Sequence, residues 1–443
     1  MNQPICLSRL LQAAFYGGAI AATTTLSLFS PPFSPTARAS FQNSPKAVLD
    51  EAWQIVNREY VDTNFNQVDW LAVRQELLSQ DYSSTDAAYT ALRQALDQLG
   101  DPYTRFLDPR QFQALTNQTS GELSGVGIRL QVDDETQVLT VVEPLENSPA
   151  SEAGIQSGDR ILAIDGRSTA GMTVEEASKL IQGEVGTQIT LRIDRDGRAA
   201  FNLDLIRAII EVPNVSYAVR QESGDRIGYI RLTEFSSHAP EQMQAAIESL
   251  LDQNVDAFVL DLRGNPGGLL QASIDISRMW IDTGSIVRTV DRNGDSEDVA
   301  ANHTALTQLP LAVLVDRNSA SSSEILTGAL KDNNRAVVVG TQTFGKALVQ
   351  SVHSLSDGSG LAVTVAHYYT PSGTDISHRG IMPDIQVSLT NQEQQTLAAN
   401  QALIGTNADP QYQQAVTALQ STIARRTAPS PVRLSVGQDA ESN

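Results

Sequence analysis

Two residues of this sequence could together carry out nucleophilic acyl transfer, a serine in a small-residue turn and a lysine in an uncharged loop. Ser321 lies in residues 319–326, Ser-Ala-Ser-Ser-Ser-Glu-Ile-Leu, between an apolar run and a helical pattern. Such a turn puts a serine at a helix N-terminus, where free backbone amides and the helix dipole favour an oxyanion. Taken alone, however, the segment is explained at least as well by serines that cap the helix.

Lysine is rare in the chain, so each lysine can be considered in turn. Lys46 opens a predicted helix, Lys179 lies on another, and Lys331 is near a helix C-terminus, where a cation suits the dipole. Lys346 has no such explanation, because it is the one charged residue in the segment 340–350, which lies between two β segments. Burial there would lower the pKa of its amine, and a neutral amine could serve as the base that a serine nucleophile needs.

Two other hydrolytic chemistries have weak support. No pair among the five histidines has the spacing of a zinc peptidase; they are His238, His303, His353, His367 and His378. Trypsin-like proteases carry their serine in a Gly-Asn-Ser-Gly-Gly turn, and the nearest match, residues 264–268, has Pro266 in the serine position. Proline cannot attack a carbonyl, so a Ser-His-Asp triad is not predicted.

The overall composition limits the possible partners. The 443 residues include 51 acidic and 31 basic side chains, a net charge of −20. Nucleic acid and anionic membrane surfaces both need a basic face, so neither is expected as a partner. The 41% of hydrophobic residues is ample for packed cores and excludes a disordered acidic chain.

Residues 1–39 have the features of a secretory signal. They contain no acidic residue, and the sequence Ala-Arg-Ala at 37–39 has the small-x-small pattern of a cleavage site before Ser40. Glycines and prolines within the apolar stretch make an uncleaved membrane anchor the weaker alternative. The signal predicts that the mature chain is exported. Cleavage also removes Cys6, the only cysteine, so the mature chain is expected to have no disulfide or thiolate ligand.

The remaining patterns predict an α/β multidomain protein. Residues 44–118 have helical periodicity, are expected to form packing helices and show no chemistry. Short apolar runs alternate with helical patterns after residue 205, which indicates a mainly parallel sheet covered on both faces. The expected parts are a signal peptide at 1–39, a helical domain at 40–120, a β-rich domain at 121–205, an α/β core at 206–390, and a helical segment with a mobile tail at 391–443.

The β-rich domain resembles a PDZ domain. The resemblance rests on the order of its elements and on residues 157–166, Ser-Gly-Asp-Arg-Ile-Leu-Ala-Ile-Asp-Gly. In that family a glycine-rich loop binds the terminal carboxylate of a peptide, which adds a strand to the sheet edge. The matching positions are Gly125, Val126, Gly127 and Ile128. The alternative is a glycine-rich hairpin turn without a ligand.

The segments around Ser321 and Lys346 resemble the C-terminal processing peptidases, which use a serine/lysine dyad. The family patterns are S-A-S-x-S-E-I and T-(F/Y)-G-K-G-x-x-Q, and the resemblance extends over nearly the whole predicted mature chain. It implies Ser321 as nucleophile, Lys346 as base and Gln350 as the residue that orients the lysine. It also implies that the backbone amides of Gly267 and Ser322 hold the oxyanion.

The chain departs from the family pattern at two positions. Ala347 replaces the glycine that usually follows the lysine, and Ser322 replaces a commoner alanine. An extended backbone at 347 accepts a Cβ, and an oxyanion amide is a backbone group, so neither change removes the dyad. Asp332 matches a family aspartate that is expected to be structural.

The resemblance implies a serine endopeptidase that recognises the C-terminal tail of its substrate through the PDZ domain and needs no metal or nucleotide. The chain resembles the cyanobacterial members in three features, which are its signal, its preference for arginine over lysine and the turn at 264–268. This resemblance implies that the protein is located in the periplasm or thylakoid lumen. Maturation of the photosystem II D1 precursor is one task of such a peptidase. The alternative from another class is a PDZ-based peptide-binding or chaperone module with a catalytically silent core.

Overall fold

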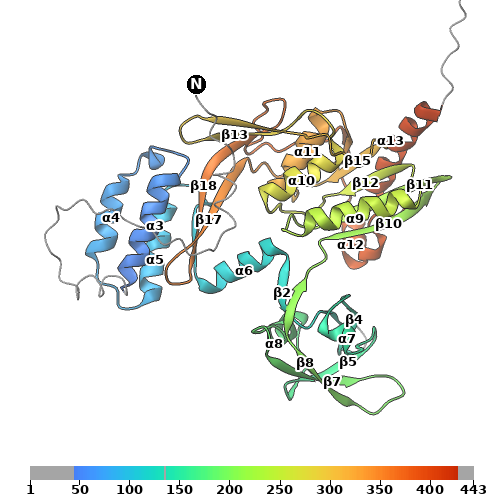
Figure 1. Cartoon of the computed structure of the whole chain (residues 1–443), viewed down its shortest axis with the longest axis horizontal. Helices are drawn as coiled ribbons and strands as arrows, with labels where there is room; N and C mark the ends of the chain where they lie inside the picture. The colour runs from blue at the N-terminus through green and yellow to red at the C-terminus, as the bar shows by residue number, and fades with distance from the viewer. Residues whose placement is uncertain (1–43, 134–135, 428–443) are drawn as a thin grey trace, which may run out of the picture. The chain divides into compact units, whose positions relative to one another are not determined.

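A computed structural model of the chain describes residues 44–133 and 136–427. The predicted signal peptide, its cleavage site and the predicted tail beyond residue 427 lie outside the described residues. The described chain divides into two compact units, of which the smaller comprises Arg110–Asn214 with Ser236–His238. The larger unit contains the rest, and Figure 1 labels most of the helices and many of the strands of both.

Three helices open the larger unit, as the periodicity predicts. They are α3 (Pro45–Glu59), α4 (Trp70–Ser79) and α5 (Thr85–Asp97), and a short 3₁₀ helix, η1 (Phe65–Gln67), connects the first two. A side-chain oxygen caps each helix by accepting from a backbone N–H of its first turn; these caps are Ser44, Asp69 and Ser84. The apolar faces of the helices form one buried cluster with strand residues Phe106, Leu361 and Val363.

Those strand residues belong to an antiparallel sheet. Its strands are β1 (Arg105–Leu107), β13 (Ser285–Asp291), β14 (Ser296–Ala300), β17 (Leu348–Ser354) and β18 (Gly360–Tyr369). The sheet has the order β1–β18–β13–β14, and β17 also pairs with β18. The antiparallel pairing of β17 with β18 agrees with the sequence, whereas β1 and the β13–β14 hairpin were not predicted.

A second sheet of six strands forms the centre of the larger unit. In spatial order it contains β10 (Val215–Glu222), β11 (Asp225–Leu232), β12 (Ala257–Asp261), β15 (Leu311–Val315), β16 (Val337–Gly340) and β19 (Ile385–Gln386). Only β10 is antiparallel to its neighbour. Strands β12 and β15 are buried at every position, which explains why they read as unbroken apolar runs.

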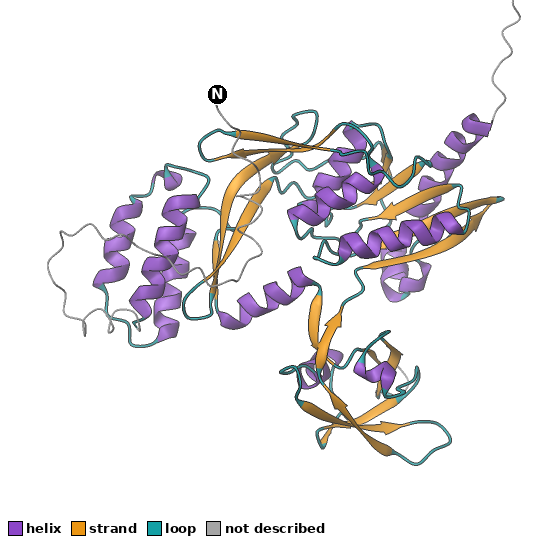
Figure 2. Ribbon diagram, viewed as in Figure 1, coloured by secondary structure: helices purple, strands orange, loops and turns teal. Residues whose placement is uncertain are grey.

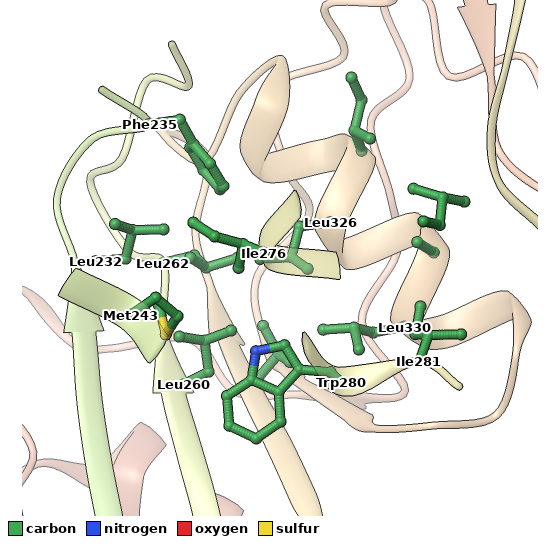
Figure 3. Close-up of a cluster of buried hydrophobic side chains, with 14 of the residues drawn as sticks. Leu232, Phe235, Met243, Leu260, Leu262, Ile276, Trp280, Ile281, Leu326 and Leu330 are labelled. Carbon is green, nitrogen blue, oxygen red and sulfur yellow. The ribbon is translucent and has the colours of Figure 1, made fainter. Parts of the chain in front are cut away.

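Helices cover both faces of this sheet, as Figure 2 shows. They are α9 (Ala239–Asp252), α10 (Leu270–Trp280) and α11 (Ser322–Asp332) on one face and α13 (Pro410–Thr427) on the other; α12 (Asn391–Ala399) and η2 (Gln401–Leu403) precede α13. Figure 3 shows the core under the first face, where Trp280 lies near Leu260 of β12 and Leu330 lies near Ile281. The predicted α/β core with a mainly parallel sheet is confirmed.

The smaller unit is β-rich. It contains α6 (Pro109–Ser120), β2 (Glu122–Gly125), β3 (Ile128–Val132), β4 (Leu139–Pro144), α7 (Pro149–Glu152), β5 (Arg160–Ile164), β6 (Arg167–Ser168), α8 (Val174–Ile181), β7 (Gln188–Asp194), β8 (Phe201–Ile206) and β9 (Ala208–Glu211). Its main sheet has the order β3–β4–β5–β7–β8, so that β3 is an edge strand. No helix among the described residues of the chain is long and apolar enough to cross a membrane.

Candidate active site

Three predicted site residues of the larger unit follow the carboxyl ends of neighbouring parallel strands. Gly267 follows β12, Ser321 follows β15, and Lys346 follows β16. Parallel strands end at one edge of a sheet, so their following loops meet there. Two backbone hydrogen bonds join these loops in pairs, from the N–H of Ala320 to the carbonyl of Asn265 (3.1 Å) and from the N–H of Phe344 to the carbonyl of Ser319 (3.1 Å).

Ser321 occupies a strained backbone conformation directly before helix α11. Its φ is 54° and its ψ is −114°, a region that residues with a Cβ rarely adopt. The surrounding structure fixes this turn from two sides. The Ser321 N–H donates to the Glu324 carboxylate (3.0 Å), and the Tyr368 hydroxyl donates to the Ser321 carbonyl (3.1 Å). A hydroxyl on such a turn has a defined position at the start of the helix.

Glu324 joins the nucleophile segment to the base segment. Its Oε2 accepts from the N–H groups of Ser321 and Lys346 (2.9 Å for the second), and its Oε1 accepts from the Thr343 hydroxyl (2.6 Å) and the Gly345 N–H (2.7 Å). The side chain is fully buried, and burial raises its pKa while the hydrogen bonds oppose that rise. Four donors to one carboxylate hold the two backbone segments in fixed register.

Lys346 is in the environment that the sequence predicted for a base. Burial lowers the pKa of its amine, the positive charge of Arg105 lowers it further, and Asp101 and Glu324 oppose this. The amine makes no hydrogen bond or ion pair with any residue in the described part of the chain. Its contact is instead with the ring of Tyr103, whose centroid lies 4.6 Å from Nζ.

The two predicted oxyanion donors lie beside Ser321. A Cβ placed on Gly267 would lie 2.8 Å from the Ala320 carbonyl oxygen, 2.9 Å from the Ser321 Cβ and 3.0 Å from the Ser322 nitrogen. The Ser322 N–H, in the first turn of α11, has no acceptor among the described residues. The Gly267 N–H differs, because it donates to the Asn265 side chain (2.9 Å).

Gln350 lies on β17 next to an irregularity in the pairing with β18. Its Nε2 is buried and has no hydrogen-bond partner among the described residues. The described structure contains no hydrogen bond between Gln350 and Lys346. A buried amide without a partner is costly, so the position is suited to a polar group that comes close in another state of the site.

The sequence analysis did not assign a role to several residues of this site. Glu324 was within the quoted motif, but its four hydrogen bonds depend on the tertiary structure. Tyr368 comes from β18, and its hydroxyl also donates to the Lys346 carbonyl. Tyr103 and Arg105 come from the N-terminal region, for which the sequence predicted only packing helices. No local pattern marks residues 101–105, because their contacts reach across more than 200 positions of the chain.

The glycine-rich loop of the smaller unit presents free backbone donors. The N–H groups of Val126 and Gly127 have no acceptor among the described residues. Gly127 has a φ of 76°, and a Cβ there would lie 2.3 Å from the Cβ of Ser148, so the position requires glycine. Gly125 ends β2 and Ile128 begins β3. The loop therefore leads directly into the edge strand of the sheet.

The α/β core carries a serine at a helix N-terminus and a desolvated lysine at the same edge of its sheet, an arrangement that suits acyl transfer. Residues 226–387 match peptidase family S41 and residues 140–195 match the PDZ domain. The carboxyl-terminal-processing protease of Picosynechococcus is 43% identical over 388 residues, which cover 87% of this chain and 92% of the relative. The chain therefore belongs to the carboxyl-terminal-processing proteases of this family and is a serine-type peptidase.

Other relatives agree with this assignment. The carboxyl-terminal-processing peptidase 2 of Arabidopsis thaliana, a chloroplastic protein, is 41% identical over 75% of this chain and 67% of its own length. A solved structure described as the photosystem II D1 C-terminal processing protease is 35% identical, with a TM-score of 0.52, and covers 84% of this chain and 100% of its own. The predicted enzyme class and the predicted fold class are thus confirmed.

Proposed function

We propose that this peptidase cleaves near the C-terminus of its substrates with Ser321 as nucleophile and Lys346 as general base. The observation that carries this assignment is the shared hydrogen bonding of Glu324, which holds the backbones of both residues within one buried cluster. The lowered pKa of Lys346 supports its role, because only the neutral amine can accept a proton. No other lysine lies at the carboxyl edge of the parallel sheet among the described residues.

The proposed reaction begins when Lys346 rotates from Tyr103 toward Ser321. The Ser321 Oγ attacks the carbonyl carbon of the scissile bond, and its proton passes to the lysine Nζ. The N–H of Ser322 stabilises the oxyanion, with the N–H of Gly267 as the second donor once it turns from Asn265. Lys346 then protonates the leaving amine as the C–N bond breaks, which leaves an acyl-enzyme ester.

Water completes the cycle. The neutral Lys346 takes a proton from the attacking water, the tetrahedral intermediate collapses, and the proton returns to the Ser321 Oγ as the ester bond breaks. Gln350 orients the rotated lysine in this proposal, because its buried amide has no other partner among the described residues. The products are a new C-terminal carboxylate and a released peptide with a free amine.

Recognition of the substrate tail is proposed for the smaller unit. The unpaired N–H groups of Val126 and Gly127 suit a terminal carboxylate, and the loop positions Gly125 and Ile128 lead the peptide to the β3 edge. An extended peptide there would hydrogen-bond to β3 as an added strand. The tail would be held by its backbone and its charged end, with little demand on its sequence.

The substrates are proposed to be protein tails in the periplasm or thylakoid lumen. The cyanobacterial and chloroplastic relatives support this location. The printed name of the D1 C-terminal processing protease structure makes the photosystem II D1 precursor the first substrate to test. The predicted signal at 1–39 agrees with export to the same compartments.

A pair of peptides tests tail recognition. Peptides of one sequence, with a free or an amidated C-terminus, are compared by kcat/KM in the full chain. We expect the free-carboxylate peptide to be preferred at least tenfold through KM, and Gly127→Ala to remove most of that preference. Equal cleavage of both peptides contradicts tail recognition by the PDZ loop.

The catalytic assignment has its own control. Ser321→Ala is expected to abolish cleavage of both peptides, and Lys346→Ala is expected to do the same. If either variant cleaves at the wild-type rate, the dyad is wrong. If the chain binds tails but neither wild type nor variants cleave them, the binding-module alternative is favoured.

A further inference from the structure

The amine of the proposed base lies against an aromatic ring from a distant part of the chain. Lys346 Nζ is 4.6 Å from the ring centroid of Tyr103, within the range over which the face of an aromatic ring attracts a cation. Tyr103 lies between helix α5 and strand β1 and is 243 positions before Lys346 in the sequence. The family patterns around the dyad do not include this residue, and the proposed reaction names it only as the contact from which Lys346 turns.

The turn that carries Tyr103 is firmly attached to the antiparallel sheet. The Asp101 carboxylate accepts from the Tyr103 N–H (2.9 Å), the Thr104 hydroxyl (2.7 Å) and the Thr364 hydroxyl (2.6 Å). The Thr104 oxygen accepts in turn from the Thr364 N–H (3.0 Å). Thr364 lies on β18, the strand that also carries Tyr368. The ring is therefore fixed to the same strand that holds the carbonyls of Ser321 and Lys346.

We propose that Tyr103 is a positioning residue for Lys346, whose ring face receives the amine in the free enzyme and holds it at the carboxyl edge of the central sheet, ready to turn toward Ser321. This inference rests on the proposed function, because it gives Lys346 the role of base. The ring makes no contact with the scissile bond in this proposal and acts only through the lysine. It stabilises the ammonium form in the free enzyme, which Lys346 must leave by losing its proton before it can turn toward Ser321 and act as a base.

The charges around Lys346 decide between its neutral amine and its ammonium form, and the Tyr103 ring acts on the same equilibrium. Burial and Arg105, which neighbours the turn on β1, favour the neutral amine. Asp101 and Glu324 favour the ammonium form, and the ring face adds to them. Tyr368 is deeply buried, and its pKa is raised well above the ordinary value, so it contributes no charge. Tyr103 and Arg105 thus act on the same proton in opposite directions.

Because Tyr103 and Arg105 act in opposite directions on the Lys346 proton, the pH profile distinguishes a positioning role of Tyr103 from a purely structural one. The acid limb of the pH profile of kcat/KM reports the base of the free enzyme. Loss of the ring face should move the limb to lower pH, because the ammonium form is then less stable. Loss of the Arg105 charge should move it to higher pH.

The experiment measures this limb in the full chain, with one free-tail peptide, for wild type and three variants. Tyr103→Phe keeps the ring face and should leave the limb in place. Tyr103→Leu should move it by roughly 0.5 to 1 pH unit toward acid and reduce the plateau several-fold. Arg105→Gln, at an exposed position, should move it in the opposite direction. Tyr103→Met serves as the ringless variant if the leucine variant does not fold.

An unchanged limb in folded ringless variants overturns the inference, as does an equal shift in Tyr103→Phe, which would assign the effect to the hydroxyl. Either result leaves the dyad intact as long as Lys346→Ala is inactive. An active Lys346→Ala with the wild-type pH profile would instead refute the proposed function itself. The two failures are therefore distinguishable.

Discussion

At the scale of single residues, the site depends on one buried carboxylate. Glu324 accepts from both the Ser321 and Lys346 backbones and from two groups of the intervening loop. Each of its two oxygens accepts two hydrogen bonds, so only a side chain with two acceptor oxygens satisfies all four donors. The residue positions the dyad without being placed to touch a substrate.

Glu324→Gln should lower both stability and activity. Whichever way the amide is turned, its NH₂ group faces two donors that can no longer be accepted, and the cost should be about 3 kcal/mol. We expect kcat to fall at least tenfold because the Ser321 turn loses its register. Urea denaturation and steady-state kinetics measure the two effects. Glu393→Gln is the matched control, because Glu393 has the same N3 capping position on exposed helix α12. Equal effects of both variants would contradict a special role for Glu324.

Lys346→Met should stabilise the fold while abolishing activity. The folded state lowers the pKa of Lys346 below its ordinary value of 10.5, so the unfolded chain binds the proton more tightly. Stability from this group therefore rises with pH from the folded pKa up to about 10.5 and is smallest below the folded value. Near pH 7 the methionine variant should have the higher Tm, and the difference should shrink as the pH approaches 10.5.

The control for that prediction is Lys179→Met, which removes an exposed helical ion pair with Glu175. It should change Tm only slightly and should show no comparable dependence on alkaline pH. A Lys346→Met variant that is less stable than wild type near neutral pH would contradict the account of a desolvated amine.

At the scale of elements, the turn after β12 must approach the nucleophile turn closely. Gly267 and Gly268 both have positive φ, and a Cβ on either would collide with backbone atoms. The Gly268 carbonyl accepts from the Ser322 hydroxyl (3.0 Å), which further joins the two turns. Both positions therefore require glycine for two reasons, the positive φ and the close approach of neighbouring backbone atoms.

Gly267→Ala should reduce kcat by about 10²- to 10³-fold, the usual effect of losing an oxyanion donor. The added Cβ would meet Ala320 and Ser321 and push the turn away from the nucleophile. Gly264→Ala is a matched control, because Gly264 also has positive φ but open space around its Cβ position. Steady-state kinetics should show a far smaller loss for this control. Similar losses in both variants would mean that backbone strain, not the close approach, explains the effect.

Much of this element arrangement could be predicted from the sequence. Strands β12 and β15 read as unbroken apolar runs because both of their faces are buried, and turn residues followed by helical periodicity locate α10 and α11. The segments proposed to hold the nucleophile and the base could be singled out because their motifs are local, and their catalytic roles stay predictions. By contrast, β1 has only three residues, and its pairing with β18 depends on contacts that no local pattern encodes. The roles of Tyr103 and Tyr368 could not be predicted for the same reason.

At the scale of the whole molecule, a buried charge network ties the C-terminal helix to the central sheet. The Arg263 guanidinium donates to Asp261 (2.6 Å), to Asp409 (2.6 Å) and to Gln411 (2.9 Å). Both aspartates are fully buried, and Asp261 also accepts from the Tyr229 hydroxyl (2.7 Å). Arg263 directly precedes the turn that carries Gly267, so this network connects α13 to the carboxyl edge of the sheet.

Asp409→Asn should destabilise the larger unit by about 3 kcal/mol, because it leaves part of a buried cation unpaired. Asp81→Asn, which removes an exposed partner of Lys46 in the same unit, should have little effect. All three tryptophans of the chain belong to the larger unit, so their fluorescence in urea reports that unit specifically. Equal midpoints for Asp409→Asn and wild type would contradict a structural role for the network.

The central claim, that Ser321 is the nucleophile, is tested most directly by trapping the acyl-enzyme. A free-tail peptide is mixed with the full chain, the reaction is quenched with acid within one turnover, and the protein is mapped by mass spectrometry. The account predicts that the N-terminal fragment of the peptide is attached to Ser321 and that Ser321→Ala carries no adduct. Attachment to another residue, or cleavage by Ser321→Ala at the wild-type rate, would contradict it.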